Sequence, residues 1–360
     1  MQEVHKFLSG SPLPVLREDH AALIAKLPKA ELHVHLEGSM EPETVVELGV
    51  RHGVELTREE VAARYQFKDF PGFIEAFKWV TSFLRQPADY ALVAERLAET
   101  LLRQNVMYAE VTLSVGVMLW RKQDAEANFL AVVEAGRRVQ AKGLRLQWIF
   151  DCVRQFGRDA AMDVARLAGR WKAEGVVAFG MGGDELSRPT EEFRDVYEYA
   201  ARKGLQCVVH AGETGSAQEV REAVEILGAR RIGHGIAVMH DPLVEETLQV
   251  FGVSLEICPT SNLRTGALAR QLGRSEASAT DHPIRGFLER GLLCSISTDD
   301  PAMFGTSLNA EYELLHRLGI PLETLAAISM HSAALCFLPE VERGKLMLEF
   351  EHRIRSLGLV

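Results

Sequence analysis

Short apolar runs alternate with longer amphipathic segments along most of the chain, and this alternation constrains the fold more than any other feature. Hydrophobicity that is mostly continuous over so few residues is typical of strands buried on both faces of a parallel sheet. Glycine or polar residues bound each run. The eight runs are AELHVHL (30–36), MYAEVTLSV (107–115), LRLQWIFDCV (144–153), VVAFGMGG (176–183), LQCVVHAGE (205–213), RIGHGI (231–236), VSLEICPTSN (253–262) and LLCSISTDD (292–300).

Segments with helical periodicity separate these runs. Residues 57–65 begin with Thr57 and Glu60 at the spacing of a capping box. Residues 124–143 carry apolar side chains at three-to-four spacing and end on glycine, and residues 190–204 repeat this form. Repeated strand–helix units predict an α/β fold, a (β/α)8 TIM barrel. A doubly wound open sheet is the alternative, but no glycine-rich phosphate-binding fingerprint follows any of the runs.

The chain of 360 residues is long enough for one barrel domain, and no low-complexity tract or linker divides it. We expect an N-terminal extension (1–27), the barrel (28–340) and a C-terminal helical tail (341–360). The first two runs are separated by residues 37–106, more than one crossover helix needs, which predicts a helical insertion after strand 1. Its aromatic stripe is either a lid over a site or ordinary core packing, and consists of Phe67, Phe70, Phe73 and Phe77.

Composition narrows the partners and the compartment. The formal net charge of −10 argues against nucleic acid or an anionic membrane as the main partner. The sequence lacks a secretion signal and any apolar run of ~18 residues, so no membrane span is expected. Its five cysteines form no C-x-x-C pair, which indicates reduced thiols and a cytoplasmic protein. The oligomeric state stays open, and a homo-oligomer is compatible with the sequence.

Polar residues that do not suit buried strands gather at the carboxyl ends of the runs, where barrel enzymes build their active sites. His33 and His35 are two residues apart on one strand, so both side chains point to the same side. The pair is either a core hydrogen-bonded pair or the start of a metal site. Together with His210 and Asp299 it offers three imidazoles and one carboxylate, a set that suits one zinc ion.

A metal ion would also explain why two carboxylates that repel each other, Asp299 and Asp300, are adjacent. The alternative is a solvated turn before the following proline. Glu213 lies three residues after His210 and is a candidate acid/base, as is His234. H-E-x-x-H is absent, which excludes a zincin-type protease. H-x-E with P-C-x-x-C is absent too, which excludes the small zinc deaminase fold. The fourth run has no lysine to bridge two metals, so one metal per chain is expected.

Six motifs stand in the order and spacing of the adenosine deaminase-like branch of the amidohydrolase superfamily, and the chain resembles that branch over residues 28–340. The resemblance implies a barrel with one zinc ion and hydrolytic removal of the 6-amino group of a purine nucleoside. The motifs are AELHVHLEGS, GGDE, HAGET, RIGHGI, CPTSN and STDDPAMFG.

The resemblance also implies roles for single residues. The zinc ligands correspond to His33, His35, His210 and Asp299. Glu213 corresponds to the acid that protonates purine N1, and His234 to the residue that orients and deprotonates the attacking water. Asp300 corresponds to the partner of N7, and Gly183 in GGDE to the backbone N–H donor to N3.

One position departs from adenosine deaminases proper, which usually read H-x-H-L-D-G. The chain has HVHLEG with Glu37, a form that resembles both adenine deaminases and the deaminases of 6-amino-6-deoxyfutalosine in menaquinone biosynthesis, and the retained GGDE favours the second. Glu37 is expected to bind the substrate near its ribose and to leave room for a 5′ extension. We therefore expect 6-amino-6-deoxyfutalosine first, adenosine second and adenine third. The futalosine-type substrate carries a benzoate, for which Arg154 is the expected cation, with Arg121 and Lys122 as alternatives.

Two other classes remain in view. A cyclic amidase would share the barrel and the metal but usually needs the bridging lysine that is missing. A purine-binding barrel without catalysis would keep the pocket but lose a metal ligand or Glu213, and the sequence keeps them all.

Overall fold

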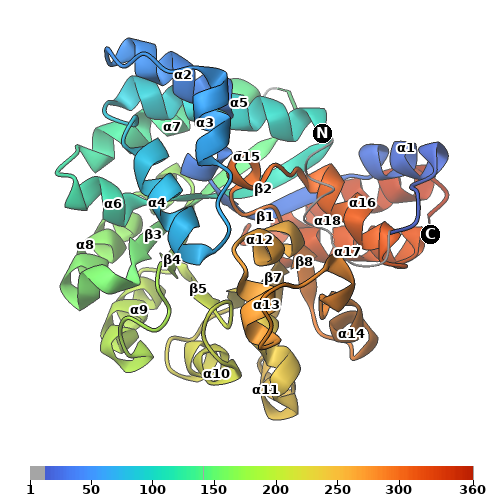
Figure 1. The fold of residues 1–360 in the computed structure, drawn as a ribbon. Helices are drawn as coiled ribbons and strands as arrows, with labels where there is room; N and C mark the ends of the chain where they lie inside the picture. The colour runs from blue at the N-terminus through green and yellow to red at the C-terminus, as the bar shows by residue number, and fades with distance from the viewer. Residues whose placement is uncertain (1–12, 141, 360) are drawn as a thin grey trace.

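The computed structural model describes residues 13–140 and 142–359. Eight parallel strands, each hydrogen-bonded to the next in chain order, form the centre of the molecule, and helices surround them (Figure 1). The prediction of a (β/α)8 barrel is confirmed. The strands are β1 (Lys29–His35), β2 (Val106–Leu113), β3 (Arg145–Val153), β4 (Val176–Gly182), β5 (Gln206–Ala211), β6 (Arg231–His234), β7 (Ser254–Ile257) and β8 (Cys294–Ile296).

The helices follow the strands around the barrel, with an additional group between β1 and β2. None in the described part of the chain has the length and apolar character needed to cross a membrane. The helices are α1 (Glu18–Lys26), α2 (Pro42–Arg51), α3 (Arg58–Arg64), α4 (Phe70–Thr81), α5 (Pro87–Arg103), α6 (Val115–Trp120), α7 (Ala125–Gln140), α8 (Gly157–Arg170), α9 (Arg194–Arg202), α10 (Ala217–Glu225), α11 (Pro242–Phe251), α12 (Pro259–Arg264), α13 (Ala267–Gln271), α14 (Ile284–Glu289), α15 (Pro301–Phe304), α16 (Leu308–Arg317), α17 (Leu322–Leu335) and α18 (Glu340–Ser356).

Strands β7 and β8 fall furthest short of their apolar runs. β7 ends at Ile257, because Pro259 opens α12 at a position where its missing N–H costs no helical hydrogen bond. β8 ends at Ile296, and the chain then turns so that Asp299 pairs with Val34 of β1 in a parallel bridge. That bridge joins the last strand region to the first.

The helical insertion contains α2, α3, α4 and α5. The capping box expected at the start of α3 is present: the amide of Glu60 donates to Oγ1 of Thr57 over 3.1 Å, and the amide of Thr57 donates to the Glu60 carboxylate over 2.7 Å. α5 packs beside α7 in the outer helical layer and is the crossover helix. The additional helices of the insertion are therefore α2, α3 and α4.

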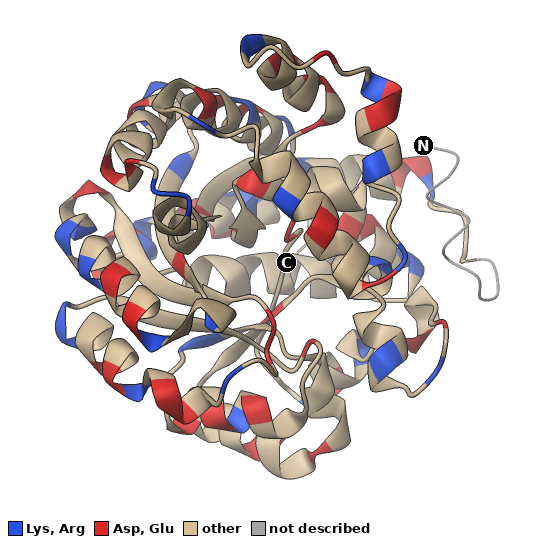
Figure 2. Ribbon diagram, turned by 60° about the vertical axis from the view of Figure 1, so that its left-hand side comes forward, with Lys and Arg blue, Asp and Glu red and all other residues tan. Residues whose placement is uncertain are grey.

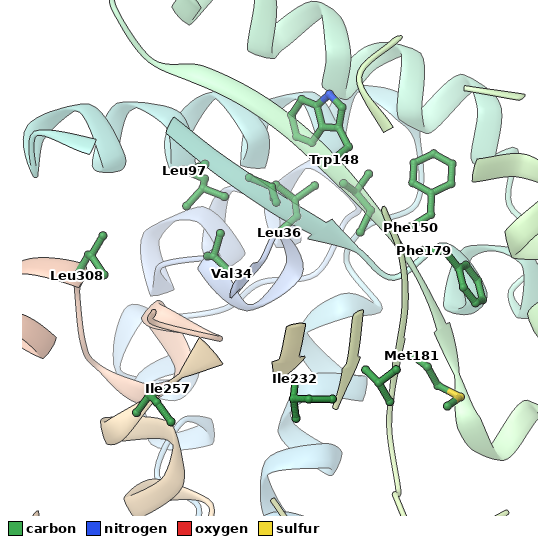
Figure 3. Close-up of a cluster of buried hydrophobic side chains, with 14 of the residues drawn as sticks. Val34, Leu36, Leu97, Trp148, Phe150, Phe179, Met181, Ile232, Ile257 and Leu308 are labelled. Carbon is green, nitrogen blue, oxygen red and sulfur yellow. The ribbon is translucent and has the colours of Figure 1, made fainter. Parts of the chain in front are cut away.

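The main core lies between the strands and the outer helices. Figure 3 shows part of it, in which Trp148, Phe150 and Phe179 project from neighbouring strands. Phe129 of α7 meets Phe150 edge-on at a centroid distance of 4.7 Å. Acidic and basic residues of both signs are interspersed over the outer helices (Figure 2). α18, which contains Phe350, packs against α17 and a second core cluster near β1 and β2.

Candidate active site at the carboxyl ends of the strands

Three histidines and an aspartate meet at the carboxyl end of the barrel. His33 and His35 lie on β1, His210 lies on β5, and Asp299 follows β8. Oδ1 of Asp299 is 3.4 Å from Nε2 of His33 and 3.3 Å from Nε2 of His35. One nitrogen from each of the three histidines lies within 4.8 Å of the others. The structure thus brings together all four residues that the sequence predicts as metal ligands.

The backbone of Asp299 explains how its side chain reaches this cluster. Its φ of 64° lies in the left-handed region, which a non-glycine residue adopts only when its surroundings hold it there. Two hydrogen bonds to β1 do so: the amide of Asp299 donates to the carbonyl of His33 (2.9 Å), and the amide of His35 donates to the carbonyl of Asp299 (2.8 Å). Oγ of Ser261 donates to Oδ2 of Asp299 over 2.7 Å, which fixes the carboxylate.

The donor set fits a divalent metal ion. Burial lowers the pKa of His35 to about 4 and holds the pKa of His210 well below its usual range, so both imidazoles are neutral, the form that binds metal. Nε2 of His33 is buried and has no hydrogen-bond partner among the described residues. A buried nitrogen left without a partner is costly unless it binds something. This nitrogen faces the cluster, as a metal ligand would.

Asp300 points into the same cavity beside the metal cluster. Its carboxyl group is buried, and its Oδ1 has no hydrogen-bond partner among the described residues. Burial, and after it the neighbouring charge of Asp299, raises its pKa well above the usual range, so it can carry a proton. The carboxyl group of Asp300 fits in this place because residue 38 is glycine: a Cβ there would lie only 1.7 Å from Oδ1 of Asp300.

Glu213 also lines the cavity, and its carboxylate lies 3.7 Å from Nε2 of His234. Burial, and after it the charge of Glu185, raises the pKa of Glu213 well above its usual range. The sequence did not predict Glu185. Its carboxylate accepts hydrogen bonds from four consecutive backbone amides, at distances of 2.8–3.3 Å, in the loop 212–215 that carries Glu213. Glu185 is the last residue of the GGDE motif, which the sequence analysis recognised without assigning a role to this side chain.

His234 completes the group at the end of β6. Burial lowers its pKa to about 4, so the ring is neutral and can accept a proton. Nδ1 of His234 lies 3.1 Å from the side-chain nitrogen of Asn262, and the side-chain oxygen of Asn262 lies 3.3 Å from Nε2 of His282. Asn262 belongs to the CPTSN motif, whose side chains the sequence analysis left without a role.

A cavity of about 450 Å³ lies above these residues, between the barrel and helices α4 and α6. Its floor is formed by the polar residues described above. Its walls are mostly apolar and come from the helical insertion and the loops after β2 and β3. The apolar lining residues are Phe70, Phe73, Ile74, Phe77, Val117, Trp120, Val153 and Phe156.

Of the two alternatives for the phenylalanine stripe, the structure shows core packing, with three of the same side chains also bordering the cavity. Phe67 and Phe73 are buried and pack on Phe304, with centroid distances of 5.9 and 5.1 Å. Phe70, Phe73 and Phe77 also line the cavity. The stripe is therefore a packed layer whose inner face forms the wall of the cavity.

Gly183 and Glu37 take different places. Gly183 lines the cavity with a φ of 96°, and a Cβ there would lie 2.3 Å from Oε1 of Gln155. Glu37 is buried behind Ser114, which lines the cavity; Oε1 of Glu37 accepts from the amide of Ser114 over 2.9 Å. Its other oxygen has no hydrogen-bond partner among the described residues, and burial raises the pKa of Glu37 to about 7.

Arg154 does not lie where a rim cation was expected. Its side chain is 2% exposed, donates to the carbonyl of Arg188 over 3.2 Å and lies 5.9 Å from the ring centroid of Phe193. Arg154 is absent from the described residues that line the cavity. The arginine follows β3 directly in a short 3-10 turn, and this turn directs the side chain into the packed outer layer. Lys122, one of the alternatives, is exposed and lies outside the lining.

Arg121 lies in the cavity wall. Its guanidinium donates to the carbonyls of Thr81 (2.5 Å) and Lys78 (3.2 Å) and to Oγ1 of Thr81 (3.0 Å). All three acceptors are uncharged, so these bonds leave its positive charge without a carboxylate partner among the described residues. Next to it, Trp120 stacks on Phe156 at a centroid distance of 5.7 Å. This part of the wall combines aromatic surface with a cation that forms no ion pair with the described residues.

Asp151 is a further residue of the cavity that sequence reasoning missed. It is buried near the end of β3, and burial raises its pKa well above the usual range. The glycines of VVAFGMGG leave room for it: a Cβ at Gly180 would lie 2.9 Å from one carboxyl oxygen of Asp151, and a Cβ at Gly182 3.2 Å from the other. The two glycines on the neighbouring strand were the sequence feature from which a side chain at this place could have been predicted.

Fold and site together define a class. A barrel whose strand ends carry three imidazoles and a carboxylate, with a protonated carboxyl group and a neutral histidine beside them, is a metal-dependent hydrolase of the amidohydrolase type. The family model described as adenosine deaminase matches residues 28–352. The chain belongs to the adenosine deaminase family and is a deaminase.

Individual relatives agree with this assignment. The aminodeoxyfutalosine deaminase of Streptomyces avermitilis is 36% identical over 92% of this chain and 93% of its own length. The adenine deaminase of Streptomyces coelicolor is 32% identical over 90% of this chain and 95% of its own. Among solved structures, the adenine deaminase of Arthrobacter aurescens is similar with a TM-score of 0.84 and 28% identity, covering 91% of this chain and 99% of its own.

Proposed function

We propose that the protein hydrolytically deaminates 6-amino-6-deoxyfutalosine, a purine nucleoside with an extended 5′ group, with one zinc ion per chain. The observation that carries the proposal is that one cavity contains both the polar residues around the metal cluster and an aromatic wall with a cation. Its floor holds the metal cluster with Glu213 and Asp300, and its wall continues past them to aromatic residues and Arg121. The similarity to the aminodeoxyfutalosine deaminase of Streptomyces avermitilis supports the same substrate.

His33, His35, His210 and Asp299 would hold the zinc ion. Three imidazoles and one carboxylate are a ligand set typical of zinc. When bound, the ion supplies Lewis acidity that makes water reactive at neutral pH. The lysine among the described lining residues, Lys78, lies on α4 and pairs with Glu75, so it is not a bridging ligand at the strand ends. One ion per chain is therefore part of the proposal.

The remaining residues bind the base and move protons. Negative charge develops on N1 when C6 is attacked, and the protonated carboxyl of Glu213 is the donor that stabilises it. His234, whose Nε2 faces Glu213 and Asp299, orients the attacking water and takes its proton in the tautomer that leaves Nε2 unprotonated. Asp300, which can carry a proton, donates to N7, and the backbone amide of Gly183 donates to N3. His234 then gives its proton to the leaving amino group and the C6 hydroxyl proton passes to Glu213, so that ammonia leaves as C6 becomes a carbonyl.

The 5′ extension would lie along the apolar wall. Its benzoate ring would contact the Trp120–Phe156 pair, and its carboxylate would bind Arg121. Arg121 takes the role that the sequence gave to Arg154, because of the three cations considered there (Arg154, Arg121 and Lys122) it is Arg121 that lines the cavity. Lys78 lines it as well, but its ammonium group already pairs with Glu75 over 2.7 Å. Adenosine would leave this part of the cavity without a partner.

We also propose a cytoplasmic location, with the nucleoside and water as the only required partners. All five cysteines are buried and free, which suits a reducing compartment. The net charge of −10 gives no reason to expect nucleic acid as a substrate.

A substrate panel tests the proposal. The zinc-loaded protein would be assayed on 6-amino-6-deoxyfutalosine, a 5′-modified adenosine, adenosine and adenine, by the ultraviolet change from 6-amino to 6-oxo purine and by ammonia release. We expect the highest kcat/KM on 6-amino-6-deoxyfutalosine. Preference for adenosine over every 5′-extended substrate would reassign the protein as an adenosine deaminase, and no release of ammonia from any of them would overturn the proposal.

A further inference from the structure

A chain of buried charged side chains runs from the metal cluster down through the barrel interior. Nδ1 of His33 lies 2.7 Å from Oε2 of Glu256 on β7. Nε of Arg231, on β6, donates to Oε1 of Glu256 over 2.5 Å. The same guanidinium forms an ion pair with Glu110 on β2. Each of these side chains is at most 4% exposed, which is unusual for charged groups.

The end of this charged network that is remote from the metal cluster is also held by hydrogen bonds. Glu110 accepts from the hydroxyl of Tyr108 and from the amide of Phe337, both over 2.6 Å. Arg231 donates to the carbonyl of Leu335 over 3.0 Å, and its guanidinium lies 3.7 Å from the ring centroid of Phe337. The segment between α17 and α18 therefore closes the network from the side opposite the metal cluster.

We infer that Glu256 and Arg231 are positioning residues for the metal. Glu256 holds the His33 ring with Nδ1 as the protonated nitrogen, so that Nε2 faces the ion, and Arg231 holds Glu256 in that orientation. Neither of them touches the substrate. A histidine ligand oriented in this way by a carboxylate binds its metal more tightly.

The geometry at His33 favours this role over simple core packing. The ring has one nitrogen in a 2.7 Å contact with a carboxylate, and the other has no hydrogen-bond partner among the described residues. A ring held only for packing would leave that second nitrogen unpaired inside the protein at a cost. The two-pronged contact of Arg231, to Glu256 and Glu110 at once, removes the freedom of Glu256 to rotate away.

Formal charges point the same way. Glu256 and Glu110 against Arg231 leave one negative charge beneath His33 (two minus one). A divalent ion with Asp299 as its one carboxylate ligand leaves one positive charge (two minus one). Interiors tolerate charges only when they are compensated. The network thus places a net negative charge next to the ligand His33, which favours a cation at the cluster.

The test is the zinc affinity of the full-length, zinc-loaded protein, measured by competition with a chelator. Glu256→Gln and Glu256→Ala should each raise the zinc dissociation constant by about 10- to 100-fold. Arg231→Lys keeps a charge but cannot bridge both carboxylates, and should raise it by about 10-fold.

A matched control exists elsewhere in the chain. Asp89 is a fully buried carboxylate that lies 2.8 Å from Nε2 of His52, at the start of α5 and away from the cluster. Asp89→Asn breaks the same kind of carboxylate–histidine pair and should leave the zinc dissociation constant unchanged. An equal loss of zinc affinity in this control would show a general effect of destabilisation and overturn the inference. A zinc dissociation constant equal to that of the wild type in both Glu256 variants would also overturn the inference.

A measurement on the wild type covers the case in which the variants do not fold. Nitrogen-15 NMR of histidine-labelled, zinc-loaded protein should show His33 protonated at Nδ1. Coordination of zinc through Nδ1 would contradict the inference. Because the readouts are zinc affinity and ring protonation, the inference can fail while the proposed deaminase activity holds, and the reverse.

Discussion

The floor and the wall of the cavity are built in different ways. The floor consists of side chains at the ends of parallel strands, each held by hydrogen bonds from a different part of the barrel: Asp299 by β1 and Ser261, and Glu213 by Glu185 through its loop. The wall consists mainly of side chains on helices α4 and α6, with Val153 and Phe156 beside them, and most of them are apolar. Hydrogen-bonded strand ends fix atoms to the accuracy that chemistry needs, while apolar helix faces fix only shape and size.

This difference suggests a division of labour. The floor would determine the reaction, and the wall would determine which 5′ group the substrate carries. Changes in the floor should then lower turnover on every substrate, while changes in the wall should alter the choice among substrates.

The largest effect is expected from Asp299→Ala. This change removes the only carboxylate ligand of the cluster, and loss of a catalytic metal is worth several kcal/mol of transition-state stabilisation. Turnover on all substrates should fall by at least ~10³-fold, together with zinc content measured by metal analysis. Full zinc occupancy in this variant would show that Asp299 is not a ligand.

Glu213→Gln should come next, with turnover lower by ~10²- to 10⁴-fold on every substrate and zinc content unchanged. The amide keeps the shape of the side chain but cannot give a carboxyl proton to N1. Steady-state kinetics and metal analysis on the same preparation separate this variant from Asp299→Ala. Turnover close to that of the wild type would remove Glu213 from the floor.

Gly38→Ala tests the close approach of Asp300. The new Cβ would lie 1.7 Å from Oδ1 of Asp300, so the carboxyl must move from its place beside the base. A displacement of this size should lower kcat/KM by ~10²-fold on all substrates. Gly344→Ala is the control, since a Cβ there meets nothing within 4 Å. Equal kinetics in the two variants would show that the position of Asp300 is unimportant.

The smallest effect is expected in the wall. Arg121→Gln should lower kcat/KM for 6-amino-6-deoxyfutalosine by about 10-fold and leave adenosine unchanged, because one charged hydrogen bond is lost at a partly exposed site. Lys122→Gln, a change at the exposed neighbour, is the control and should alter neither substrate. Equal losses on both substrates would mean that Arg121 acts only by tying α4 to the barrel.

The sequence predicted the floor better than the wall for a physical reason. Strand periodicity places residues such as His33 and His35 on a known side of a known edge, so spacing alone brings ligands together. Arg154 follows a strand too, but a local turn directs its side chain away from the cavity, and no periodicity reports that turn. Glu185 and Glu256 could not be assigned because their roles depend on contacts with residues 27 and 223 positions away.

The account is tested most directly by one ratio: kcat/KM for 6-amino-6-deoxyfutalosine divided by kcat/KM for adenosine, measured in the wild type, Glu213→Gln and Arg121→Gln. We predict that Glu213→Gln leaves the ratio at its wild-type value while both rates collapse, and that Arg121→Gln lowers the ratio by about 10-fold. A ratio that changes in Glu213→Gln, or stays the same in Arg121→Gln, would contradict the division between a floor that performs the reaction and a wall that selects the substrate.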